Sequence, residues 1–259
     1  MKKIIFLTIF YSTSILSTSA QIAERSSFWI QTDYYNELVH KKNMVNSKEY
    51  FNPIKLFHYS NNKLFFQALN SRIAEALYNK VDDDTYIIEN IQKNVNLNYF
   101  SKEELQNYRF HIKKDNDRLL LIKSNPKFKP DTINYTYLPE MSKIEPLRVI
   151  DGYLLLKGNF DMTAHNTNKK ESNMTFSMSG EIEGSDFIRY KILNSSILVE
   201  DPHDGYANFL IEFQDKSGKR YKKVLLYIKK NELELYDCAR NSAGRYELFE
   251  NSKMSLISN

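Results

Sequence analysis

The residues most suited to chemistry lie in one short segment, Asp201-Pro202-His203-Asp204-Gly205. His203 is flanked by the carboxylates of Asp201 and Asp204, and a carboxylate bonded to an imidazole fixes the tautomer needed for base catalysis or metal binding. Asp, Pro and Gly also favour turns, so composition favours an ordinary turn over a site. A hydrolase that uses His203 is therefore a distant alternative among the functions considered.

The other histidines give no metal motif. Their spacing matches neither the helical nor the hairpin arrangement of zinc ligands. They are His40, His58, His111 and His165. The three aspartates at 82–84 lack the glycine and the terminal glutamate of an EF-hand loop, so a solvated turn is the better interpretation. The sequence therefore predicts no metal and no cofactor.

Candidate nucleophiles are equally weak. Cys238 is the only cysteine, and no histidine stands near it in the sequence. A buried structural thiol is the favoured interpretation, and a free thiol that pairs between chains is the second. The sequence contains no Gly-x-Ser-x-Gly elbow and no phosphate-binding glycine loop. We therefore expect a protein that is not an enzyme.

Residues 1–20 have the composition of a cleavable secretory signal. Two lysines follow the first methionine, 4–16 is mainly apolar, and small residues lead to Ala20. Cleavage between Ala20 and Gln21 predicts an exported protein. Because Gln21 is not a cysteine, a lipid anchor is not expected, and the predicted destination is the periplasm or the extracellular medium. We expect no integral membrane segment after cleavage, since no later apolar run is as long.

Charge argues against one class of partner. Without the two lysines of the signal, the chain has 34 basic and 32 acidic residues, which gives a net charge of +2. Nucleic acids and anionic membranes bind concentrated basic faces, whereas the lysine pairs of this chain are scattered. We therefore expect no nucleic-acid partner.

The pattern of the chain changes from helical to alternating after its first element. Thr32 or Asp33 is placed to cap a short helix that runs to Val39. From residue 54 onward, short alternating runs are separated by turn residues, which is typical of antiparallel strands. The runs between 207 and 236 give the clearest meander. Ser101 and Glu104 form a capping box that predicts one further turn of helix.

Two segments are harder to assign. Residues 70–80 fit either a helix or a strand, and we favour the strand because Ile73, Leu77 and Val81 alternate with polar residues. Residues 153–157 form a short apolar run that we assign to a strand, with a bend at Gly158.

Counting these runs predicts ten to twelve short strands and no βαβ pattern. The predicted fold class is mainly β, an antiparallel meander that forms a lipocalin-like barrel or sandwich with a short N-terminal helix. Residues 21–259 are long for one domain but within the range of barrels and sandwiches. We expect a single β-rich domain, with two β lobes that meet near 139–146 as the alternative.

A family resemblance follows from these features. A signal peptide, Phe28-Trp29 before a short helix, and a closing meander of 222–227 and 233–236 resemble the lipocalin-like secreted proteins of Bacteroidetes-type bacteria. The lipocalin Gly-x-Trp signature is missing, because Ser27 precedes Phe28-Trp29. The resemblance implies a closed barrel and a ligand pocket; function does not follow from fold alone.

Two function classes remain. The first is a non-catalytic binding protein that holds a small apolar ligand inside its barrel. The second is an envelope or secreted protein-protein interaction module whose barrel is filled by its own side chains. Small inward-facing residues would favour the ligand carrier, and inward Phe, Leu and Tyr would favour the interaction module.

Overall fold

The computed structural model describes most of the chain from residue 27 onward. The described residues are 27–42, 54–60, 63–68, 73–82, 85–89, 109–115, 118–125, 128–141, 145–167, 169–198, 206–219, 221–229 and 232–259. The predicted cleavage site at Ala20 and Gln21 lies outside them, as do the capping box at Ser101 and Glu104 and the segment 201–205.

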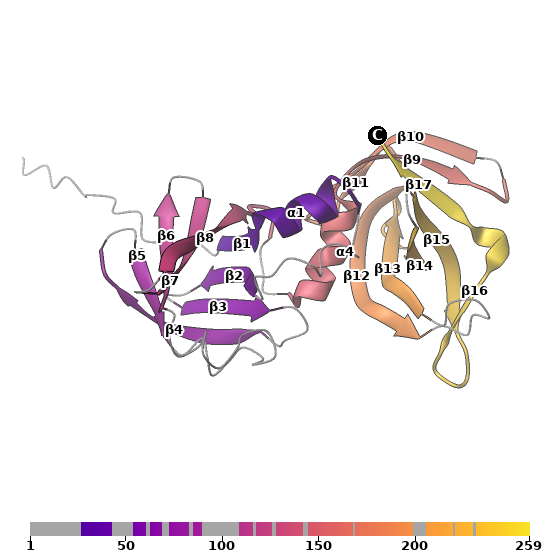
Figure 1. Cartoon of the computed structure of the whole chain (residues 1–259). Helices are drawn as coiled ribbons and strands as arrows, with labels where there is room; N and C mark the ends of the chain where they lie inside the picture. Colours follow the sequence, from indigo (N-terminus) through magenta and orange to yellow (C-terminus); the bar gives the residue numbers. More distant parts are fainter. Residues whose placement is uncertain are drawn as a thin grey trace, which may run out of the picture.

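The first eight strands form a closed antiparallel barrel in which each strand pairs with the next one in the sequence (Figure 1). They are β1 (Ser27–Gln31), β2 (Ile54–Ser60), β3 (Lys63–Ala68), β4 (Ala74–Lys80), β5 (Thr85–Glu89), β6 (Arg109–Asp115), β7 (Arg118–Asn125) and β8 (Phe128–Tyr137). β1 closes the ring by pairing with β8, where Trp29 lies opposite Tyr137. The helix α1 (Thr32–Val39) lies between β1 and β2 in the sequence.

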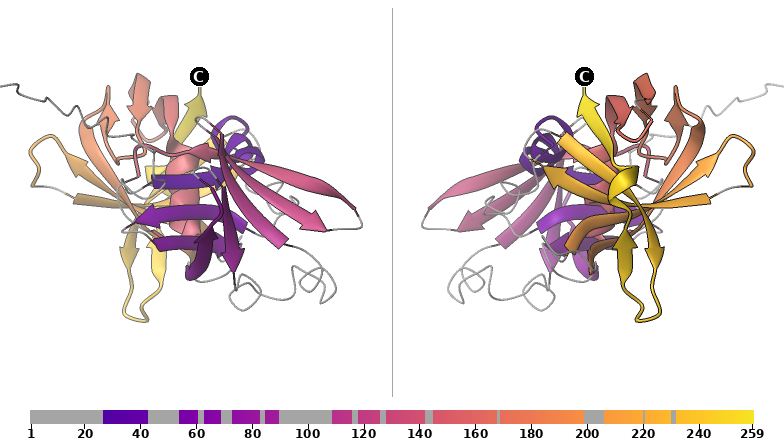
Figure 2. Two further views of the ribbon diagram at one scale, coloured as in Figure 1. Left: turned by 90° about the vertical axis from the view of Figure 1, so that its left-hand side faces the viewer. Right: turned by 90° about the vertical axis from the view of Figure 1, so that its right-hand side faces the viewer.

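The remaining strands form a second antiparallel sheet that curves around the helix α4 (Leu147–Leu156), as Figures 1 and 2 show. They are β9 (Gly158–Ala164), β10 (Lys169–Phe176), β11 (Ile182–Glu183), β12 (Phe187–Leu198), β13 (Tyr206–Asp215), β14 (Tyr221–Lys229), β15 (Glu232–Arg240), β16 (Tyr246–Leu248) and β17 (Met254–Ser258). A 3-10 turn, η3 (Glu250–Ser252), precedes β17.

Long-range pairing brings the second sheet almost to closure. Its order is β11-β10-β9-β17-β15-β14-β13-β12, so β17 lies between β9 and β15, while β16 pairs only with β15. At the two ends, Glu181 next to β11 forms a bridge with Arg189 of β12. The backbone N–H of Tyr190 also donates to the carbonyl of Gly180 at 2.7 Å. The two edges of the sheet are thus joined at this point.

Bulky side chains occupy the interior of the barrel. Along β2, Phe57 points into the barrel, whereas Leu56 and His58 point outward, as strand alternation requires. The Phe57 and Tyr135 rings pack edge to face with centroids 4.9 Å apart. The buried members of this barrel core are Trp29, Phe57, Leu64, Phe66, Tyr86, Ile88, Ile112, Leu119, Leu121 and Tyr135.

The prediction of a strand at 153–157 is wrong, because these residues belong to α4 and to its C-terminal cap. The four consecutive apolar residues at 153–156 fit a buried strand and a buried helix equally well. Pro146 stands directly before the first helical residue, where its fixed φ is compatible with helix entry. Leu147, Ile150 and Leu154 give the helix its 3.6-residue apolar repeat, and Leu155 and Leu156 widen the buried face.

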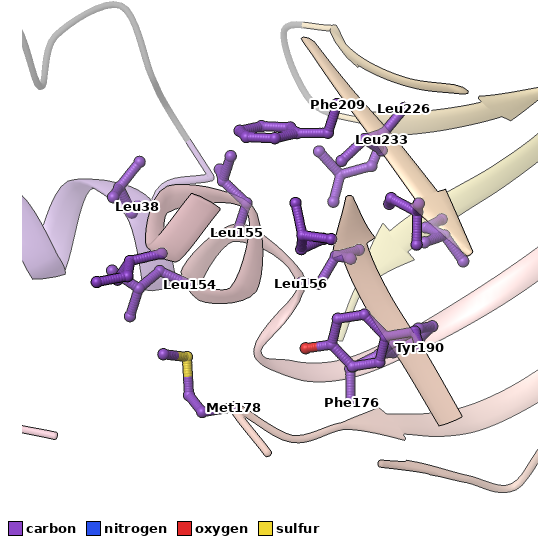
Figure 3. Close-up of a cluster of buried hydrophobic side chains, with 14 of the residues drawn as sticks. Leu38, Leu154, Leu155, Leu156, Phe176, Met178, Tyr190, Phe209, Leu226 and Leu233 are labelled. Atoms are coloured by element: carbon purple, nitrogen blue, oxygen red, sulfur yellow. The ribbon is translucent and has the colours of Figure 1, made fainter. Parts of the chain in front are cut away.

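The main core joins α4 to both sheets (Figure 3). Leu154, Leu155 and Leu156 lie among inward side chains of the second sheet such as Phe209 and Leu226. The same core includes Leu38 of α1 and residues on the outer face of the barrel, among them Phe28, Ile30 and Leu56. The helices α1 and α4 therefore form a layer between the barrel and the second sheet.

Three polar contacts tie this layer together. The Tyr34 hydroxyl of α1 donates to Asp151 of α4 at 2.7 Å, in a buried setting. The Gln67 side chain of β3 accepts a hydrogen bond from the Leu147 backbone N–H at 2.5 Å. At the other end of α4, the Lys42 ammonium donates to the Lys157 carbonyl at 2.7 Å. Both ends of α4 are thus satisfied by residues of the N-terminal half.

The predicted fold class is confirmed: the chain is mainly β and antiparallel, with barrel-like sheets and a short helix at 32–39. The strand favoured at 70–80 is confirmed as β4, and the meander at 207–236 as β13, β14 and β15. The cap prediction is wrong, because Gln31 is the N-cap of α1 and no side chain caps it. The likeness to lipocalin-like barrels holds at this coarse level. The single domain at 21–259 stays a prediction.

Candidate interaction surface on the second sheet

The residues singled out from the sequence do not meet at one place in the described structure. Asp201, His203 and Asp204 lie outside the described residues. His58 is buried on β2, His111 lies on β6, and His165 follows β9. The candidate site therefore has to be sought among residues that sequence analysis passed over.

The outer face of the second sheet carries a hydrophobic cluster of its own, separate from the main core. We call these residues the outer-face cluster. Its buried centre is formed by Leu210 of β13 with Leu225 and Tyr227 of β14. Leu225 lies opposite both Leu210 and Tyr236 in the strand register. The partly buried side chains around this centre are Leu193, Tyr236, Cys238, Tyr246 and Leu248.

Continuous apolar runs in β13 and β14 produce this cluster. Phe209 and Ile211 face the main core, so Leu210 between them must face outward. In β14, Val224 and Leu226 face inward while Leu225 and Tyr227 face outward. A strand that is apolar on both faces has an unbroken run of hydrophobic residues in its sequence. The run at 224–227 was the available signal, and the prediction of a simple meander overlooked it.

Cys238 belongs to the rim of the outer-face cluster and is half-buried. Burial, helped by the neighbouring Asp237 carboxylate, raises the pKa of its thiol to about 11. The thiol therefore stays protonated at neutral pH and is a poor nucleophile. This environment fits the structural role predicted for Cys238.

A row of polar residues lies beside the cluster on the same face of the sheet. We call Glu234, Lys253 and Ser255 the polar row. Glu234 of β15 pairs in register with Tyr227 of β14 on one side and with Ser255 of β17 on the other. The Lys253 ammonium lies 2.5 Å from one oxygen of Glu234, and the Tyr236 hydroxyl donates to the other oxygen at 3.0 Å. The row thus connects the aromatic residues of the cluster to a charged group.

The charge of Glu234 is held by these neighbours. Burial alone would raise the pKa of this carboxyl, but hydrogen bonds from Lys253 and Tyr236 and the positive charge of Lys253 and Lys229 outweigh burial and lower it. Glu234 is therefore ionised at neutral pH. Lys229 also lies over the Tyr227 ring, with its ammonium 5.8 Å from the centroid.

At the end of the row, His165 and Ser255 form a pair that sequence analysis missed. The His165 Nε2 atom lies 2.8 Å from the Ser255 hydroxyl oxygen, which is the distance of a nucleophile-base hydrogen bond. Ser255 is only 4% exposed, and among the described residues no acidic group bonds the other ring nitrogen of His165. The His165 backbone N–H donates to the Lys253 carbonyl at 3.0 Å. The two contacts join the residue after β9 to β17 and to Lys253 just before it, which is a structural role.

Two further searches cover only the described part of the chain. Within those residues, no three His, Cys, Asp or Glu side chains are grouped so that they could hold a metal ion. Within the same residues, no helix has the length and apolarity needed to cross a bilayer.

No protein-family model and no curated protein sequence matches the chain.

Proposed function

We propose that the protein is an exported, non-catalytic interaction module that contacts another protein through the outer face of its second sheet. The observation that carries this proposal is the filling of both interiors. Ten large side chains occupy the barrel core among the described residues. The helix α4 occupies the hollow of the second sheet. A carrier of the lipocalin type needs an interior space that such side chains leave open.

The composition of the outer face supports the same proposal. Its cluster combines leucines with Tyr227, Tyr236 and Tyr246, and tyrosine is enriched where protein surfaces meet. By strand alternation, Tyr221 at the start of β14 faces the same side as Leu225, and it is 60% exposed. The charged Lys253 and Glu234 supply a polar rim to the apolar centre.

Site-specific photocrosslinking in the host tests the contact surface. A photoreactive phenylalanine analogue at Tyr221 should crosslink to one discrete protein. The crosslinked product should have the same mass in every independent preparation. The same analogue at Val81, which is 57% exposed on the barrel side, is the matched control and should capture nothing discrete. Equal capture at both positions, or none at either, would contradict the proposed surface.

Native mass spectrometry of the protein purified from its host tests the competing ligand hypothesis. An interaction module with filled interiors should give the mass of the bare chain under gentle conditions. A small apolar molecule that stays bound in one-to-one ratio and dissociates on unfolding would favour the carrier. Holding such a ligand in the barrel remains a prediction from the sequence until this measurement is made.

A further inference from the structure

His58 is a buried histidine with an incomplete set of hydrogen bonds. Its side chain is 3% exposed and points away from the barrel interior, between β1 and β3. The backbone of Ser27 hydrogen-bonds the imidazole, but the Nδ1 atom has no hydrogen-bond partner. A neutral imidazole tolerates this, because its unprotonated nitrogen only leaves a lone pair unused.

Aromatic rings surround the imidazole. The Phe28 ring stacks on it with centroids 3.9 Å apart and an interplanar angle of 31°. The Phe65 ring lies on the other side, with centroids 6.0 Å apart. These residues are the direct strand neighbours of His58, since Phe28 and Phe65 lie opposite it in β1 and β3. Phe28 also belongs to the main core, so the position of His58 bears on the packing of the barrel against α1 and α4.

Charged groups on the neighbouring strands do not compensate a positive imidazole. The segment β1 contains no ionisable residue. On the same face of β3, Lys63 lies two residues from Phe65, and its ammonium pairs with Glu75 of β4 at 3.1 Å. A protonated imidazole would therefore place a buried N–H at Nδ1 without an acceptor and a buried charge without an opposite charge.

We propose that His58 is an acid-sensitive latch, by which we mean that protonation of its imidazole loosens the pairing of β1 with β2 at the place where the barrel packs on the main core. This inference is independent of the proposed function. Burial lowers the pKa of His58 below its ordinary value of 6.5, although the Ser27 hydrogen bond acts in the opposite direction. Because this pKa is lower in the folded chain than in the unfolded chain, the unfolded chain binds a proton first on acidification. The contribution of His58 to stability is therefore fully present above the unfolded pKa, and it falls as the pH drops below 6.5.

The test compares urea unfolding of three proteins between pH 7.5 and pH 4.5: the wild type, His58→Phe and His165→Phe. The folding equilibrium constant of the wild type should fall about tenfold more per pH unit than that of His58→Phe, over the range between the unfolded and folded pKa values. His165→Phe, which removes a histidine far from β1 and β2 in the sequence, should leave the fall attributed to His58 in place. Parallel pH profiles for the wild type and His58→Phe would overturn the proposal.

Two measurements on the wild type keep the test decisive even if His58→Phe does not fold. Nuclear magnetic resonance of labelled histidines should show His58 titrating below the ordinary histidine value of 6.5. Hydrogen exchange, corrected for its intrinsic pH dependence, should show β1 and β2 losing protection on acidification before β13 and β14 do. Titration of His58 at or above 6.5, or uniform loss of protection, would contradict the latch.

Discussion

The barrel and the second sheet fill their interiors in different ways. The barrel core is built by side chains of its own strands, such as Phe57, Phe66 and Tyr135. The second sheet closes around α4, whose leucines take the place of inward side chains from opposite strands. Large aromatic residues can fill a narrow ring, whereas a wider sheet needs an inserted element to reach the packing density of protein interiors. Among the described residues, large apolar side chains therefore line both interiors.

Glycine usage differs as sharply between the two regions. All seven glycines lie after residue 151, so the barrel strands contain none. In the second sheet, Gly180 and Gly184 have positive φ values of 84° and 75° and meet backbone atoms of neighbouring strands. A side chain would not fit there. The second sheet therefore depends on close backbone approaches that require glycine, whereas the barrel strands contain no glycine.

The largest expected effect lies in the barrel core. Phe57→Ala removes a fully buried ring that packs on Tyr135 with centroids 4.9 Å apart. The free energy of unfolding should fall by about 4 kcal/mol, because a cavity adds to the lost burial. Urea denaturation measures it, with Val81→Ala at an exposed position as the control that should stay within about 0.5 kcal/mol. A loss below 1 kcal/mol would mean that the barrel is not packed as described.

The matching change in the second sheet is Leu155→Ala. Leu155 is fully buried inside the main core, and its truncation should cost about 3 kcal/mol. Because Leu155 and Phe57 belong to different clusters, the double variant should lose the sum of the two single losses within about 0.5 kcal/mol. A strong departure from additivity in denaturant unfolding would show that the two interiors are coupled.

The glycine comparison tests a local feature, the junction that closes the second sheet. A Cβ atom at Gly180 would lie 2.5 Å from the Tyr190 carbonyl oxygen, at the junction that closes the second sheet. Gly180→Ala should therefore cost about 3 kcal/mol, from backbone strain and the clash together. Gly218→Ala is the matched control, because φ is 70° there but the nearest atom is a flexible side-chain nitrogen at 3.5 Å, and strain alone costs about 1 kcal/mol. Equal losses in thermal unfolding would contradict the described junction.

The smallest effect concerns the contact that ties the two regions together. Burial lowers the pKa of Lys42 from 10.5 to about 8, while its ammonium bonds the Lys157 carbonyl and lies over the Phe160 ring. Between pH 8 and pH 10.5 the unfolded chain holds a proton that the folded chain has released, so this group's contribution to stability rises with pH. The stability of the wild type relative to Lys42→Met should increase over this window. Lys63→Met, at an exposed position, serves as the control for the loss of a lysine side chain.

The sequence predicted the parts of this comparison that depend on local pattern. Alternation identified the strands of the final meander, and helical spacing identified α1. It failed at α4, where four consecutive apolar residues fit a buried strand as well as a helix. It also could not give the pairing of β17 with β9 or of β1 with β8, because these segments are far apart in the chain. The outer-face cluster was missed because the two faces of β14 were not considered separately.

The position of β17 has a consequence for the order in which the chain folds. The barrel is complete in sequence when β8 ends at Tyr137, before α4 begins. The second sheet lacks a strand between β9 and β15 until residues 254–258 have been made, and its leucine-rich helix stays without full cover until then. Long-range strand pairing of this kind is slow and leaves apolar surface exposed in the meantime. The second sheet can therefore bury its apolar surface fully only after β17 has paired with β9 and β15. All strands of the barrel are available for pairing earlier.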